Sequence, residues 1–86
     1  MLDRKAKEKI IEKFRTHATD TGSPQVQSAI LTAEMKDLMD HLKVHKKDYS
    51  SRRGLLRKVN ERRKLMHYLQ REEPKEYQKL EEKLKL

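Results

Sequence analysis

The chain has 86 residues and a net charge of +8, with 34% apolar and 42% charged residues. A chain of this size buries only about 60% of its unfolded surface, so we expect a single domain over residues 1–86 with a thin core. The absence of cysteine, of an apolar run near the roughly 20 residues of a membrane span and of a secretory signal predicts a cytoplasmic protein without disulfides or thiolate zinc sites.

The first predicted helix covers residues 4–16. Asp3 precedes it as a suitable N-cap, and one face of the segment carries Ala6, Ile10 and Phe14. The polar turn at residues 19–23 then combines Gly22, which tolerates positive φ, with a serine cap. Pro24 follows at a position typical of the first residue of a helix.

The second predicted helix begins at Pro24 and continues to about Val44. Apolar residues recur along it at helical spacing, namely Val26, Ile30, Leu31, Met35, Leu38 and Leu42. The polar break at residues 45–51 offers Asp48 or a serine as the next N-cap.

The third predicted helix runs to about Arg71, and its expected buried residues are Leu55, Leu56, Val59, Met66 and Leu69. Gly54 costs about 1 kcal/mol of helix propensity near its start unless close packing requires it. A final helix begins at Pro74, with Tyr77, Leu80 and Leu84 at helical spacing. With no strand-like alternation or repeat, we predict an all-α fold of four helices. The second and third form a long antiparallel hairpin, because their connection is short, and the short first and fourth helices pack with it.

Positive charge is concentrated in residues 41–71, which hold eleven Lys and Arg against Asp48 and Glu61 and so carry +9. The other 55 residues sum to −1. Such concentration favours a polyanion site, where bound counterions are released together, and nucleic acid is the leading partner class. An anionic membrane is the alternative, but the chain has no Trp and only one Phe to place in lipid.

The third predicted helix carries a polar stripe, which we define as Arg53, Arg57, Lys64, Tyr68 and Arg71. Their spacings of four, seven, four and three residues place them on one face. Cations in a row match a phosphate backbone, and Tyr68 offers stacking or a hydroxyl contact. The alternative is a solvated face, but Glu61 is the only acid between Arg53 and Arg71, so salt bridges within the helix do not explain the stripe.

His41, Asp48 and Ser51 have the residue types of a nucleophilic triad, and His41 with His45 resembles a metal pair. We reject both readings, because no glycine-rich elbow, third metal ligand or room for a water-excluding pocket accompanies them. We therefore expect neither an enzyme nor a metal or other cofactor. One role for Asp48 is to cap a helix. A second role, for all three side chains, is to read a wide, shallow RNA minor groove, which short polar groups beside cations suit.

Several motifs together closely resemble the bacterial 30S ribosomal protein S15 family. They are DTGS at residues 20–23, VQ at 26–27, LKVHKKD at 42–48, SRRGLL at 51–56, RRKL at 62–65 and YL at 68–69. The resemblance covers nearly the whole chain in order. It implies a four-helix, cytoplasmic protein of the 30S subunit that binds 16S ribosomal RNA early and helps to nucleate assembly of the platform.

The resemblance also implies which residues bind RNA. A three-way junction would meet Thr21, Gly22, Gln27, Tyr68 and Arg71, and a G·U/G·C step would be read in the minor groove by His41, Asp48 and Ser51. Phosphate contacts are expected from Arg52, Arg53, Arg57 and Lys64. Further partners would be 23S ribosomal RNA, through an intersubunit bridge, and other small-subunit proteins, mainly through shared RNA, while the free protein is expected to be a monomer.

The sequence departs from the family pattern at Gln25, where an acid is usual, at Glu34, often arginine, and at Tyr49, often histidine. Its end also lacks the usual glycine and terminal arginine. Glu34 and the altered end bear on auxiliary phosphate contact and on placement at the bridge. Two alternatives remain: a helical bundle that binds only proteins, with little salt dependence, and a general double-strand binder, with little preference among duplexes.

Overall fold

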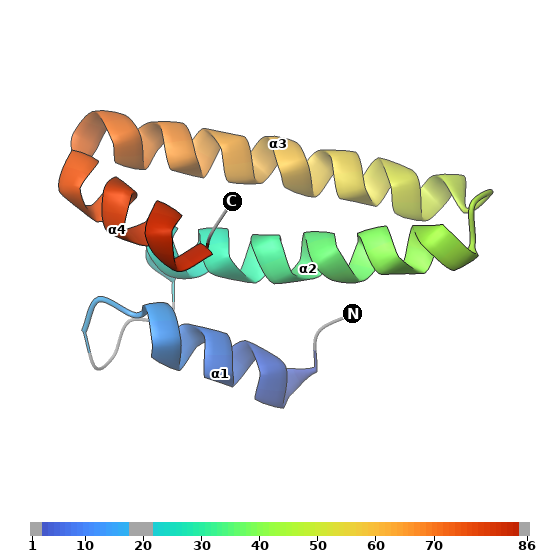
Figure 1. Ribbon diagram of the computed structural model, residues 1–86, viewed down its shortest axis with the longest axis horizontal. Helices are drawn as coiled ribbons and strands as arrows, with labels where there is room; N and C mark the ends of the chain where they lie inside the picture. The colour runs from blue at the N-terminus through green and yellow to red at the C-terminus, as the bar shows by residue number, and fades with distance from the viewer. Residues whose placement is uncertain (1–2, 18–21, 85–86) are drawn as a thin grey trace.

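The structure, a computed structural model, describes residues 3–17 and 22–84. Within these ranges it contains four helices and no strand, as Figure 1 shows. They are α1 (Arg4–Phe14), α2 (Pro24–Val44), α3 (Tyr49–Glu72) and α4 (Pro74–Leu84). The predicted all-α architecture is confirmed. None of the helices in the described ranges is long and apolar enough to cross a membrane.

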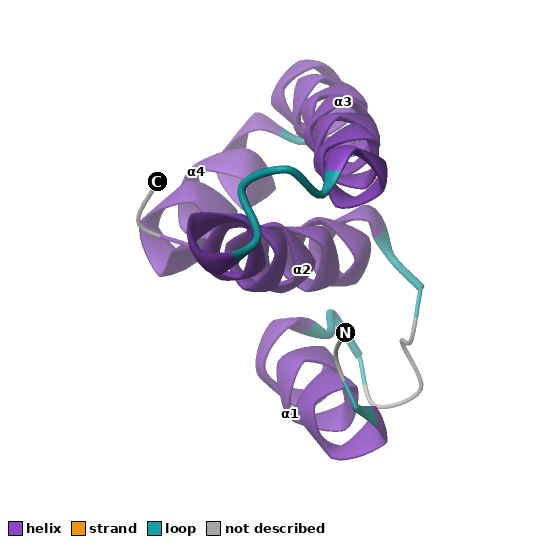
Figure 2. Cartoon of the chain, turned by 90° about the vertical axis from the view of Figure 1, so that its right-hand side faces the viewer, coloured by secondary structure: helices purple, strands orange, loops and turns teal. Residues whose placement is uncertain are grey.

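The two long helices, α2 and α3, lie antiparallel and form the predicted hairpin (Figure 1). α4 turns back from the end of α3 and lies along the N-terminal half of α2, while α1 packs on the side of α2 away from α3 (Figures 1 and 2). The molecule measures 40 × 28 × 19 Å along its principal axes. Because α2 has 21 residues and a helix rises 1.5 Å per residue, its ends stand about 30 Å apart.

Side-chain caps fix the starts of three helices. Asp3 Oδ1 accepts a hydrogen bond from the backbone N–H of Ala6 at 2.8 Å, and Ser23 Oγ accepts one from that of Val26 at 3.3 Å. Asp48 caps α3 in the same way. These bonds satisfy donors that the first turn of a helix leaves free. The end of α1 differs from the prediction: the helix stops at Phe14 rather than residue 16, because the backbone becomes extended at Arg15.

The core forms where all four helices meet. Its buried residues come from every helix, and they are Phe14, Val26, Ala29, Met66, Leu69 and Leu80. The predicted packing of Tyr77, Leu80 and Leu84 on the bundle is confirmed. Leu56, predicted to be buried, is instead 59% exposed. The reason is that α4 covers only the C-terminal half of α3, so α2 alone shields the other half and one flank of the helix remains open (Figure 1).

Replacing Leu69, which is fully buried, with alanine is expected to lower the free energy of unfolding by about 2–5 kcal/mol, since a cavity remains in the core. Urea denaturation measures the change. Leu56→Ala removes the same atoms from an exposed site of the same helix, so its effect should stay within about 0.5 kcal/mol. Equal losses from the two variants would contradict this description of the core.

Candidate nucleic-acid interface

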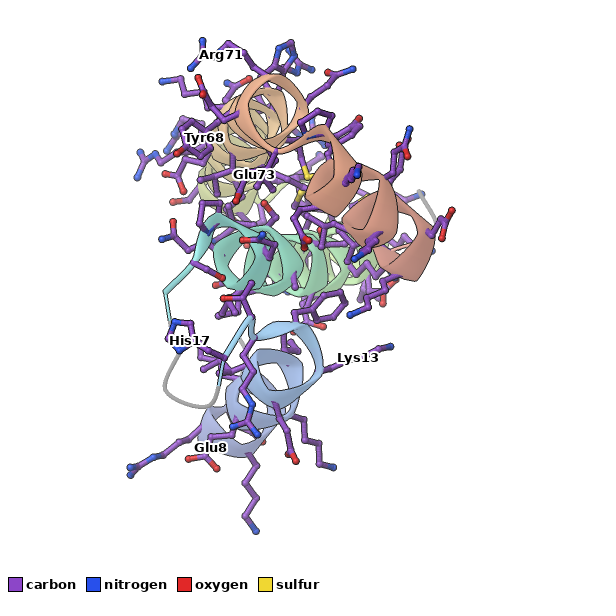
Figure 3. The ribbon with its side chains drawn as sticks, turned by 90° about the vertical axis from the view of Figure 1, so that its left-hand side faces the viewer. Glu8, Lys13, His17, Tyr68, Arg71 and Glu73 are labelled. Atoms are coloured by element: carbon purple, nitrogen blue, oxygen red, sulfur yellow. The ribbon has the colours of Figure 1, made fainter. Side chains whose placement is uncertain are left out.

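The polar stripe lies on an exposed face of α3, as predicted. Figure 3 shows Tyr68 and Arg71 projecting from α3 on sides that α4 does not cover. Across the described ranges, Arg53, Arg57 and Lys64 take part in no ion pair, whereas Arg71 Nε lies 3.0 Å from Glu72 Oε1. Three cations of the stripe are therefore available to an external anion, and the stripe is not a row of internally neutralised charges.

The turn between α2 and α3 is organised around the Asp48 carboxylate. One oxygen, Oδ2, lies 2.7 Å from His41 Nε2 and accepts a hydrogen bond of 2.7 Å from the Ser51 hydroxyl. The other, Oδ1, accepts from the Ser51 backbone N–H at 3.0 Å. The structure thus brings together the three residues predicted to form one site, although His41 and Asp48 belong to different segments of the chain.

These bonds also set the charge of the site. The Ser51 hydroxyl, followed by His41 and the Ser51 backbone N–H, holds the pKa of Asp48 well below its usual range. Hydrogen bonds to the ionised form have this effect because they stabilise the carboxylate relative to the acid. Asp48 is therefore an anion near neutral pH, and it can only accept hydrogen bonds.

The order of contacts is wrong for nucleophilic catalysis. In a catalytic triad, histidine lies between the serine and the carboxylate and takes the proton from the hydroxyl. Here Asp48 lies between His41 and Ser51, and the Ser51 hydroxyl donates to the carboxylate. The rings of His41 and His45 contact each other, with centroids 4.6 Å apart, but within residues 3–17 and 22–84 no group of three potential ligands could hold a metal ion.

Just before α2, the Gly22 carbonyl accepts a hydrogen bond from Gln27 Nε2 at 2.6 Å. Thr21, also predicted to bind RNA, lies outside the described residues. The start of α2 lies at the end of the molecule where α3 terminates (Figure 1), and His17 projects on the same side as Tyr68 (Figure 3). The predicted junction residues Gly22, Gln27, Tyr68 and Arg71 therefore gather at one end of the hairpin, with Asp48 at the other.

Arg52, predicted to contact phosphate, already has partners within the protein. Its Nη2 donates to the Lys46 carbonyl at 2.8 Å, and its guanidinium carbon lies 5.7 Å from the centre of the Tyr49 ring. The side chain thus braces the turn between α2 and α3. Arg52 remains exposed, so this bracing supplements its positive charge at the surface.

The ion pair and the hydrogen bond that join α2 to α3 were not predicted from the sequence. Lys58 Nζ lies 3.1 Å from Glu34 Oε2, with both side chains mostly buried. Arg62 Nε donates to Thr32 Oγ1 at 2.7 Å, and burial lowers the pKa of this guanidinium. The seven-residue spacing of Gln27, Glu34 and His41 places them on one face of α2. This spacing indicates that α2 has a polar face. The partner of Glu34 on α3, Lys58, could not be predicted from spacing.

A model of the family described as ribosomal protein S15 matches residues 7–86. The chain belongs to the ribosomal protein S15 family. It is 52% identical over 86 residues to the small ribosomal subunit protein uS15 of Caldanaerobacter subterraneus subsp. tengcongensis, covering 100% of this chain and 98% of that protein. It is 53% identical over 85 residues to uS15 of Dictyoglomus thermophilum, covering 99% of this chain and 96% of the relative.

The resemblance found in the sequence is thereby confirmed. As a member of the S15 family, the protein is a structural, non-enzymatic component of the small ribosomal subunit and binds ribosomal RNA. Of the alternatives raised by the sequence, the bundle that binds only proteins and the membrane-surface helix do not agree with this membership.

The lowered pKa of Asp48 predicts how acid affects stability. A carboxylate whose pKa falls on folding contributes stability above its unfolded pKa, about 3.9, and the contribution is lost as the pH falls through the folded value. Asp48→Asn should therefore be less stable than the wild type at pH 7 but lose less stability between pH 5 and pH 2. Thermal melts across this range, with Asp37→Asn on the exposed side of α2 as control, measure the difference. An acid-induced loss equal to that of the wild type would exclude the network as its source.

Proposed function

We propose that this S15 protein binds 16S ribosomal RNA at two places, one at each end of the α2–α3 hairpin. The turn between α2 and α3 reads a G·U/G·C step in a minor groove. The turn before α2, with Tyr68 and Arg71, holds a three-way junction. The single observation that carries the proposal is the Asp48 network, in which His41 and Ser51 are fixed on one carboxylate beside the polar stripe.

The chemistry of the Asp48 network fits a minor groove. RNA has a wide, shallow minor groove that displays base edges and 2′-hydroxyls, and guanine presents its N2 amino donor there. An ionised Asp48 is an acceptor for such donors, while His41 and Ser51 can contact 2′-hydroxyls or base acceptors. Because the three side chains hold one another, little conformational entropy is lost on binding.

The residues at the other end suit a junction. Tyr68 is 46% exposed and offers a ring on which an unstacked base can lie. Arg71 brings a guanidinium to the same end, and glycine at position 22 lets an RNA strand approach the backbone closely. The Gln27 bond to the Gly22 carbonyl fixes Gly22 against the first turn of α2.

The separation of the two sites supports a clamp. They stand about 30 Å apart. The helices between them are held together by packing, by the Lys58–Glu34 ion pair and by the Arg62–Thr32 hydrogen bond. A protein that grips a junction at one end and a helix at the other fixes the angle between RNA segments. In this way the S15 protein would help to nucleate the platform of the 30S subunit, meet its protein neighbours mainly through shared RNA and contribute a bridge to 23S ribosomal RNA.

A general double-strand binder is the competing function, since the free cations of the polar stripe would attract any duplex. The Ser51 hydroxyl distinguishes the two. Ser51→Ala should reduce discrimination between RNA with the matched G·U/G·C step and a mismatched RNA by about 1–3 kcal/mol, because one contact of the site is lost. Filter binding at fixed salt measures both affinities.

The matched control is Ser50→Ala, which removes a hydroxyl from the adjacent, exposed residue. It should leave discrimination unchanged. Footprinting on a naked 16S fragment that contains the junction, with an unrelated duplex as competitor, then locates the two contact regions. Equal losses of affinity by Ser51→Ala on matched and mismatched RNA would instead show that Ser51 only supports the start of α3.

Arg57 tests the electrostatic part of the proposal. Arg57→Ala should weaken binding to all RNAs and reduce the slope of log affinity against log salt by up to about 1, because one phosphate contact is lost. Arg63→Ala removes the same charge from the side of α3 that borders Tyr77 and Glu81 of α4, and it should change the slope less. Binding measured from low to moderate salt compares them, and equal slopes for Arg57→Ala and the wild type would remove Arg57 from the interface.

A further inference from the structure

Gly54 lies inside α3 although glycine is the least favourable helix residue apart from proline. Close packing within the protein does not require it. Apart from the adjoining residues and the backbone of its own helix, no atom lies within 4 Å of the position that a Cβ would take. An alanine would fit there, so the missing side chain has no structural cause among the described residues.

The surroundings of Gly54 point to the RNA-binding side of α3. Ser51 lies one turn before it and Lys58 one turn after it, so the three share a face. Both neighbours are held down, Ser51 by Asp48 and Lys58 by Glu34. Along Ser51, Gly54 and Lys58, the helix surface therefore has no side chain that extends freely outward. The exposed Arg53 and Arg57, which form no ion pair among the described residues, lie beside this surface.

We propose that Gly54 is the point at which the sugar–phosphate backbone of the bound RNA lies directly against α3. The proposal rests on the function proposed for Ser51, because a strand whose groove is read at Ser51 must continue past the next turn of the helix. Glycine permits such close approach of a ligand to the protein backbone. Arg53 and Arg57 then reach phosphates on either side of the contact.

The expected effect of a side chain at this position follows from hydrogen-bond geometry. The contacts at Ser51 and Asp48 need heavy-atom distances of about 2.7–3.2 Å, and a methyl group that displaces the strand by roughly its own radius breaks them. The same methyl group improves helix propensity in the free protein. Stability and RNA affinity should therefore change in opposite directions.

The test compares Gly54→Ala and Gly54→Leu with the wild-type protein. Both alanine and leucine are strong helix formers, so both variants should raise Tm by roughly 4 °C or more. Affinity for RNA with the matched step should fall about tenfold or more for Gly54→Ala and further for Gly54→Leu, because the larger side chain displaces the strand more. Gln78→Leu places the same bulk on the exposed surface of α4 and should bind as the wild type does.

Each other outcome overturns the proposal. Wild-type affinity in both variants would mean that RNA does not approach Gly54, and equal losses would mean that backbone flexibility, not close approach, is what the glycine supplies. A lowered Tm would show that the position is not open. Ser51→Ala separates the Gly54 proposal from the proposed function. If Ser51→Ala loses discrimination between matched and mismatched RNA while the Gly54 variants bind normally, only the Gly54 contact is wrong.

Discussion

The packing of α2 against α3 is the constraint on which the other features depend. A chain with few apolar residues cannot hold two long helices together by a large core, and the fully buried Val26 and Leu69 lie near one end only. Further along the hairpin, Arg62 binds Thr32 and Lys58 pairs with Glu34. These contacts fix the position of α2 relative to α3 more than they add stability, because the attraction within a partly buried ion pair is roughly cancelled by the cost of desolvating its charges. The two ends of the hairpin consequently keep a fixed separation.

Asp48 contributes to the stability of α3 and, in the proposed function, to RNA recognition. As an N-cap it satisfies a backbone donor at the start of α3, and the same carboxylate orients the His41 ring and the Ser51 hydroxyl. A capping carboxylate must be ionised and fixed in position, and both properties are also what a hydrogen-bond acceptor for RNA requires. The proposed recognition site therefore needs no additional ordering, because folding of α3 has already ordered it.

Most of the fold could be predicted from local signals. Asp3, Ser23 and Asp48 cap helices, proline stands at the first position of α2 and α4, and apolar spacing marks the faces that pack. Leu56 was misplaced because spacing identifies an apolar face but not how much of it a short neighbouring helix covers. The Glu34 and Lys58 pairing was missed because a contact between residues 24 positions apart depends on hairpin register. His41, Asp48 and Ser51 were grouped by residue type and assigned to one base-pair step by family resemblance, and the hydrogen bonds between them give that grouping a physical basis.

The distribution of charge explains how a strongly basic protein can still be selective. In the proposed function, attraction comes from Arg53, Arg57 and Lys64 on α3, whereas the residues suited to reading RNA lie at the two ends of the α2–α3 hairpin. Between those ends, on the face that also carries Gln27 and His41, Glu34 neutralises Lys58. A duplex lying along that face would meet an ion pair there and gain little from counterion release. Under the proposed function, favourable contacts lie at the two ends of the hairpin and on one side of α3, so an RNA that presents a junction and a groove at the matching separation would gain more than a uniform duplex.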